Sequence, residues 1–159
     1  MADVVDKVTR SRMMSGIRSK DTKPEIAIRK ALFSRGFRYR LHDKVLPGKP
    51  DLVFPRFNAV IFVDGCYWHM HDCALFKMPS SRRDFWKAKL EANRRRDKLV
   101  RDQLTELDWR HMTVWECALK GKQRLDFESL ISSLESWILK DGVSTEIRGH
   151  DDSRSNRLD

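Results

Sequence analysis

Hydrophobic and polar positions along this chain follow two periods, the 3.6-residue period of a helix and the two-residue period of a strand. Residues 22–35 open on the capping-box pattern Thr-Lys-Pro-Glu and continue with apolar residues at helical spacing, and Gly36 is placed to end the helix. A second, longer helix is predicted over residues 82–107, with an inward face made of Phe85, Leu90, Leu104 and Leu107. A third helix is predicted from the apolar stripe of Phe127, Leu130, Ile131, Leu134, Trp137 and Ile138.

Short apolar runs between these helices predict strands. Residues 37–41 alternate apolar and basic side chains, which is typical of a half-exposed strand. Residues 51–54 and 59–63 are two more apolar runs, and the turn-like residues 55–58 between them predict a hairpin. Residues 109–116 predict a further strand. The order helix, strands, helix, strand, helix predicts an α/β fold with a mixed central sheet flanked by helices.

The chain of 159 residues is long enough for one domain with a substantial core. Residues 1–20 are rich in lysine and arginine, and we expect a basic arm that becomes ordered on a partner; a solvated tail is the alternative. Residues 21–142 contain the predicted elements and form the expected domain. Residues 143–159 are polar, and we expect a disordered tail there.

The net positive charge of the chain indicates which kind of molecule it binds. The chain carries 32 Lys and Arg against 23 Asp and Glu, a formal net charge of +9, and three arginines, Arg94 to Arg96, lie together on the long predicted helix. Such a balance favours a polyanionic partner, above all nucleic acid. A membrane partner is not expected, because there is no long uncharged apolar run. The first residues lack a secretory pattern, so we expect a cytoplasmic protein.

Soft metal ligands are concentrated in one short segment. Cys66, His69, His71 and Cys73 fall within eight residues, and Cys117 ends a predicted strand that the sheet could bring beside them. Three cysteines cannot all pair within one chain, and four Cys and His ligands close a structural zinc site. Buried cysteines without a metal are the alternative. Spacing alone does not decide whether His69 or His71 is the histidine ligand.

A second group of residues suits a hard cation and phosphodiester hydrolysis. Asp51 opens a predicted strand and is the candidate magnesium ligand. Glu25 is a candidate water-orienting carboxylate, and His69 is a candidate general base if it is free of zinc. The alternatives are a helix-capping role alone for Glu25, a turn-ending role for Asp51, and a zinc-binding or solvent-facing role for His69.

Four segments resemble one known family. Pro47–Asp51 (Pro-Gly-x-Pro-Asp), Gly65–Cys73 (Gly-Cys-Tyr-Trp-His-x-His-x-Cys), Phe85-Trp86 and Val114–Cys117 (Val-Trp-Glu-Cys) are similar to the very short patch repair (Vsr) DNA mismatch endonucleases of bacteria. The resemblance runs from the N-terminus to about residue 140. It implies a restriction-endonuclease-like fold and a Mg²⁺-dependent nick on the 5′ side of the thymine in a T·G mismatch. Such mismatches arise when 5-methylcytosine is deaminated within a cytosine-methyltransferase site.

The resemblance also implies roles for particular residues. Asp51 and the main-chain carbonyl of Val63 would bind magnesium, His69 would act as the base, and Glu25 would order water on the metal. The structural zinc would be held by Cys66, His71, Cys73 and Cys117. DNA would be contacted by Met14 in the N-terminal arm, by the wedging aromatics Tyr67, Trp68 and Trp86, and by Lys89 and Asn93 at the mismatched pair; core filling is the alternative for Trp68 and Trp86.

Two positions depart from the family pattern. Val63 stands where a member of the family has threonine, and Asp64 stands where it has histidine, so Asp64 could add a carboxylate to the metal site or change its proton chemistry. The implied protein is a cytoplasmic monomer, nucleoid-associated when on DNA and linked functionally to a DNA cytosine methyltransferase and to mismatch-repair proteins. Two other functions fit the residues: a restriction-type nuclease that cuts matched DNA, and a zinc-stabilised DNA-binding module without activity.

Overall fold

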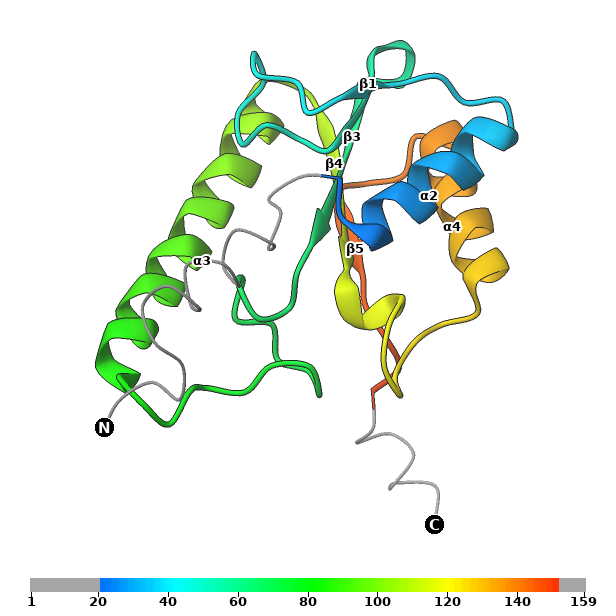
Figure 1. Ribbon diagram of the computed structural model, residues 1–159. Helices are drawn as coiled ribbons and strands as arrows, with labels where there is room; N and C mark the ends of the chain where they lie inside the picture. Colours follow the sequence, from blue (N-terminus) through cyan, green and yellow to red (C-terminus); the bar gives the residue numbers. More distant parts are fainter. Residues whose placement is uncertain (1–20, 152–159) are drawn as a thin grey trace.

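The computed structural model describes residues 21–151 (Figure 1). Five strands form one sheet in the order β1-β2-β3-β4-β5. The first two pairings are antiparallel and the last two are parallel, which confirms the predicted mixed α/β sheet. The elements are α2 Lys23–Ser34, β1 Arg40–Leu41, β2 Leu52–Phe54, η1 Pro55–Phe57, β3 Ala59–Asp64, α3 Arg83–Glu106, β4 Arg110–Trp115, η2 Glu116–Ala118, α4 Phe127–Leu139 and β5 Thr145–Ile147.

Helices cover both faces of the sheet. Figure 1 shows α3 on one side and the pair α2 and α4 on the other. Central strand β3 serves both faces, because successive side chains of a strand point to opposite sides. Its Ala59 and Ile61 belong to the core beneath α2 and α4, whereas Val60 and Phe62 belong to a smaller core that includes Leu104 of α3.

The start and end of α2 follow the local sequence. The Thr22 hydroxyl accepts a hydrogen bond from the Glu25 N–H at 3.4 Å, so Thr22 is the N-cap, as predicted. The Glu25 carboxylate accepts from the Asp21 N–H at 3.1 Å. Gly36 has a φ of +97°, and the following residue, Phe37, donates its N–H to the Leu32 carbonyl at 3.1 Å. The predicted terminator is therefore confirmed.

Two strand and helix predictions need correction. The strand expected over residues 37–41 is limited to Arg40–Leu41. In α3, Leu90 and Leu104 are buried as predicted, but the inward placement of Phe85 and Leu107 is wrong, since these are 48% and 56% exposed. Leu107 is the C-cap, where the helical stripe no longer fixes the side chain, and Phe85 lies in the first turn against Trp86.

The expectation of a disordered tail from residue 143 is wrong for residues 145–147. They form β5, which pairs in parallel with β4 from Met112 onward. Its residues are exposed or half-buried, and it is held by main-chain pairing with β4 and by the packing of Ile147 against the larger core. The predicted arm (1–20), Met14 within it, and residues 152–159 lie outside the described residues. Among the described helices, none has the length and apolar character needed to span a bilayer.

Candidate active site and metal-binding cluster

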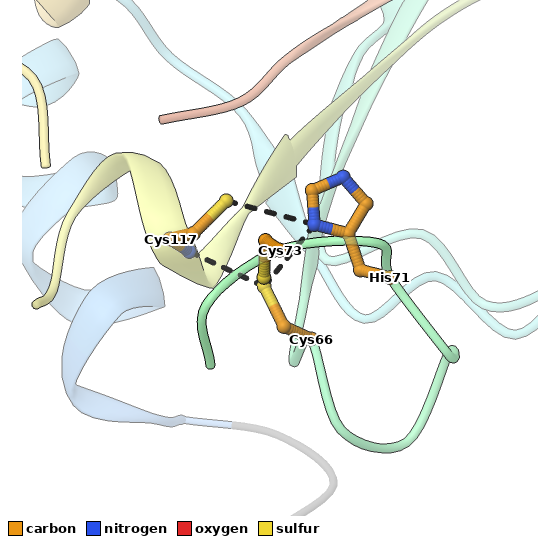
Figure 2. A group of neighbouring side chains, drawn as sticks. All are labelled: Cys66, His71, Cys73 and Cys117. Carbon is orange, nitrogen blue, oxygen red and sulfur yellow. Dashed lines mark hydrogen bonds between the residues drawn. The ribbon is translucent and has the colours of Figure 1, made fainter. Parts of the chain in front are cut away.

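Three cysteines and one histidine meet where β3 and β4 end (Figure 2). Asp64 and Trp115 are opposite one another in the parallel β3–β4 pair, and Cys66 and Cys117 each follow two residues later. His71 and Cys73 return to the same point on the loop after β3. One donor atom from each of these four residues lies within 4.8 Å of the others.

The separations within this cluster suit a tetrahedral ion. The Nδ1 atom of His71 lies 3.5 Å from the Cys66 sulfur and 3.6 Å from the Cys117 sulfur. Sulfur and nitrogen ligands on a tetrahedral zinc ion would be about 3.6 Å apart, given their usual bond lengths. Main-chain N–H groups of Cys117 and Gly149 each donate to a cluster sulfur at 3.3 Å. The donor set and its spacing therefore fit one soft metal ion.

Burial explains why these side chains need such an ion. It raises the pKa of the Cys66 and Cys117 thiols, and the neighbouring sulfur of Cys73 adds to the rise in both. Burial likewise lowers the pKa of His71, whose ring stacks on Trp115 with centroids 4.0 Å apart. A bound cation is what would stabilise the thiolates in this buried place. The histidine in this cluster is His71, and His69 lies outside it.

The segment after β5 covers the cluster, a contact that sequence reasoning missed. Gly149 is buried, and its N–H reaches the sulfur of Cys117. The next residue, His150, donates its N–H to the Gln123 carbonyl at 2.7 Å, and the Gln123 side chain returns a hydrogen bond to the His150 carbonyl at 2.8 Å. The covering segment contributes only main-chain groups to these three contacts, so its side-chain pattern gave no signal.

A cleft of about 950 Å³ is lined in part by the first residues of the loop after β3, among them Gly65, Tyr67 and Trp68. Asp51, Val63 and His69 all line it, although they come from the start of β2, from β3 and from the loop after β3. Basic side chains line it too: Lys44, Lys49, Arg96 and Arg101. The structure thus brings together the predicted acid and histidine in a concave, partly basic setting.

Asp51 is a largely buried carboxylate in an acidic neighbourhood. Its Oδ2 accepts a hydrogen bond from the Val63 N–H at 2.7 Å, which places the two predicted magnesium-binding residues side by side. Burial raises the pKa of Asp51 to about 8, and the negative charges of Glu25 and Asp64 act in the same direction, whereas the Val63 hydrogen bond opposes the rise. A cation would relieve this clustering of carboxylates.

His69 lies between two carboxylates. Its Nδ1 contacts the Asp97 carboxylate, and its Nε2 is 3.8 Å from Asp64. Burial alone would lower the pKa of His69, but the hydrogen bond with Asp97 and the charge of Asp64 outweigh it, so the pKa lies above its ordinary value. Asp97 comes from α3, and sequence reasoning missed it because no local pattern marks which acid on a polar helix faces a distant loop.

Asp64 forms a salt bridge with Arg101. It is 8% exposed, and its Oδ2 accepts from Arg101 at 2.9 Å. The same Arg101 nitrogen donates to the Thr113 hydroxyl at 2.9 Å, and its guanidinium lies over the Phe62 ring, 3.8 Å from the centroid. Asp64 therefore stands in the cleft wall with its charge balanced by an arginine of α3.

Glu25 is almost fully buried, at 1% exposure, and has several donors. Arg29 contacts its Oε2 at 2.8 Å, and Nε2 of His42 lies 2.9 and 3.1 Å from its two oxygens. Glu25 thus does more than close a capping box. His42 and Arg29 were not identified from sequence; the four-residue spacing of Glu25 and Arg29 on a helix was the available signal.

The predicted wedging aromatics Tyr67, Trp68 and Trp86 form one group, and the first two of them line the cleft. Ring centroids are 5.1 Å apart for Tyr67 and Trp68 and 6.2 Å apart for Trp68 and Trp86. All three are partly exposed and lie outside both core clusters. The Asn93 amide donates to the Trp68 carbonyl at 3.2 Å, and the Lys89 ammonium lies 5.8 and 5.6 Å from the two tryptophan rings.

Sequence comparisons give independent evidence about the family of this chain. Residues 2–75 match the family model described as DNA mismatch endonuclease Vsr. The DNA mismatch endonuclease Vsr of Escherichia coli K12 is 45% identical over 147 residues, which cover 92% of this chain and 94% of that protein. The type II nicking enzyme V.XorIIP of Xanthomonas oryzae pv. oryzae is 47% identical, covering 79% of this chain and 93% of that enzyme.

A third relative is the type II nicking enzyme V.NmeAIP of Neisseria meningitidis serogroup A, which is 43% identical over 77% of this chain and 87% of that enzyme. The match with the Escherichia coli protein covers 147 of the 159 residues, which must include the cysteine–histidine cluster and the cleft described above. This chain belongs to the family of Vsr DNA mismatch endonucleases.

Proposed function

We propose that this protein nicks one strand of duplex DNA on the 5′ side of the thymine in a T·G mismatch, and so starts very short patch repair. The observation that carries the proposal is the cleft in which Asp51, Val63 and His69 meet, in a chain of this family. A mixed sheet with helices on both faces supports the proposal of a restriction-endonuclease-like fold.

Asp51 and the main-chain carbonyl of Val63 would hold a magnesium ion. Clustered carboxylates, Asp51 with a raised pKa among them, are the hard oxygen donors that magnesium prefers. When bound, the ion neutralises charge on the phosphate and makes water a better nucleophile. Glu25 lies beside Asp51 and would orient water there.

His69 is suited to take the proton from the attacking water. Its contact with Asp97 fixes the orientation of the ring, in the way a carboxylate orients the base of a hydrolase. Water then adds to phosphorus as the bond to the leaving oxygen breaks. Arg101, anchored by Asp64, and the nearby Arg96 give this side of the cleft positive charge for the phosphate chain.

The cluster of Cys66, His71, Cys73 and Cys117 would hold a structural zinc ion. Four protein donors leave no open position, so this ion would stabilise the fold without taking part in hydrolysis. Tyr67, Trp68 and Trp86 would insert into the base stack, where a mismatch is the least costly step to open. Asn93, by holding the Trp68 main chain, and Lys89, beside both tryptophans, would support contacts with the mismatched pair.

A nicking assay tests the proposal. Purified protein is incubated with T·G and fully paired duplexes, with Mg²⁺ or with EDTA, and Asp51→Ala is compared with Asp102→Ala, an exposed carboxylate that forms a surface ion pair with Lys98. We expect Mg²⁺-dependent nicking of the T·G duplex alone, lost in Asp51→Ala and kept in Asp102→Ala, with duplex binding unchanged. Cutting of paired DNA would indicate a restriction-type nuclease, and binding without any nick a DNA-binding module.

The remaining expectations concern the setting of this activity. We propose that the protein works as a monomer in the cytoplasm, on nucleoid DNA, beside a DNA cytosine methyltransferase whose deaminated sites supply the mismatches. Mismatch-repair proteins are the expected further partners. Gel filtration of the protein with and without duplex tests the monomeric state.

A further inference from the structure

His42 connects the two elements that bring Glu25 and Asp51 to one place. It directly follows β1, and its main-chain N–H donates to the Asp51 carbonyl at 3.1 Å. Its ring reaches in the other direction, with Nε2 placed 2.9 and 3.1 Å from the two oxygens of Glu25 in α2. One residue thus ties helix α2 to the residue that precedes β2.

The backbone of His42 is unusual. Its φ is +49°, in the left-handed region that residues other than glycine seldom adopt, although histidine, asparagine and aspartate adopt it more often than most. Such a conformation persists only where surrounding contacts hold it, and it is concentrated at functional sites. For His42 the holding contacts are those with Glu25 and Asp51.

Burial shows why Glu25 depends on its donors. Glu25 is 1% exposed and does not line the cleft, whereas His42 does. Arg29 also contacts Glu25, but it is shared with Asp21, whose carboxylate it contacts at 2.7 Å. Without His42, Glu25 would keep Arg29 and the Asp21 N–H as donors but lose the one that reaches both of its oxygens, so its hydrogen-bonded contact with Asp51 would be held less firmly.

We propose that His42 is a positioning residue for nicking, which fixes the Glu25 carboxylate beside Asp51 so that both face a divalent cation together. This inference rests on the proposed function, because it gives His42 a part in the same cation-dependent step. Asp21, Glu25 and His42 could by geometry hold a metal ion themselves. The Arg29 guanidinium, within 2.8 Å of both carboxylates, already supplies the positive charge there, so we place the cation at Asp51.

The test compares His42→Ala with His42→Gln, whose amide N–H can still donate to Glu25, and with His150→Ala, an exposed histidine whose observed contacts are through its main chain. Three quantities are measured: the Mg²⁺ concentration that gives half-maximal nicking of a T·G duplex, KM for that duplex, and Mn²⁺ binding to the protein–duplex complex by electron paramagnetic resonance.

In His42→Ala we expect both cation affinities to fall about tenfold, the effect of losing one hydrogen bond to a charged group, with KM for DNA unchanged. His42→Gln should recover most of the loss, and His150→Ala should match the parent. Unchanged cation affinity in His42→Ala, or an equal loss in His42→Gln, would overturn the assignment. A parent protein that binds Mn²⁺ but does not nick T·G duplex would refute the proposed function while leaving the binding comparison decisive for His42.

Discussion

Replacing Gly149 by alanine tests whether the segment after β5 braces the metal cluster. A Cβ at this position would lie 2.4 Å from the Cys117 carbonyl oxygen and 2.6 Å from the Gln123 carbonyl oxygen. Both are main-chain atoms, which cannot turn aside as a flexible side chain can. The segment after β5 must therefore move away from these two carbonyl groups, and the main-chain hydrogen bonds beside Gly149 would be lost.

The size of the effect follows from the hydrogen bonds at stake. Moving the segment would break three of them: Gly149 N–H to the Cys117 sulfur, His150 N–H to Gln123, and the Gln123 side chain to the His150 carbonyl. At about 1 kcal/mol each, the loss is about 3 kcal/mol. For a domain of this size, that lowers the melting temperature by roughly 6–12 °C.

The assay is thermal unfolding followed by circular dichroism, together with bound metal measured by elemental analysis. Gly65→Ala is the matched control, because a Cβ there would meet nothing nearer than 3.6 Å and should change the melting temperature little. We expect Gly149→Ala to melt lower and to lose metal more readily to a chelator. A Gly149→Ala protein that melts like the parent with a full complement of metal would refute the bracing role.

Other predictions follow from the cluster, the aromatics and the histidine. Cys117→Ser should lose the metal and unfold or aggregate, because a structural ion contributes folding free energy directly; a stable, metal-replete variant would exclude the four-ligand site. Trp68→Ala should leave the melting temperature nearly unchanged but reduce the preference for T·G over paired duplex in a binding titration, and a large loss of stability would instead make it a core residue. The nicking rate should rise with pH through the raised pKa of His69, since only the neutral ring accepts a proton. Asp97→Asn removes the charge that raises this pKa, so the rising limb of the pH profile should move to lower pH; a limb that stays in place would contradict the assignment of His69 as the base.

Local pattern was enough wherever neighbours in sequence decide the structure. Thr22 and Gly36 mark the ends of α2 because capping and left-handed termination depend on a few adjacent residues. The hairpin of β2 and β3 follows from two apolar runs with a short turn between them. The proximity of Cys66 and Cys117 could also be predicted, because each follows the end of a predicted strand and the sheet can place two strand ends side by side.

Long-range choices of partner were not predictable in this way. Asp97 is one of several polar residues on α3, and only the rotation of that helix against the sheet decides that it faces His69. In the sequence nothing distinguishes His42 from other loop residues; only the structure shows its positive φ and the contact of its ring with Glu25. Strand β5 has only three residues with one half-buried apolar side chain, Ile147, which is too short a pattern to predict a strand at the sheet edge. Each of these depends on the packed fold as a whole.

The two functional regions alternate along one short loop: Cys66, His71 and Cys73 belong to the sulfur cluster, whereas Tyr67 to His69, between the first two, line the cleft. Oxidation of the cysteines, or scarcity of the metal, would release the loop after β3 and with it the placement of His69. Damage to the cluster should therefore switch strand cleavage off instead of leaving it unregulated.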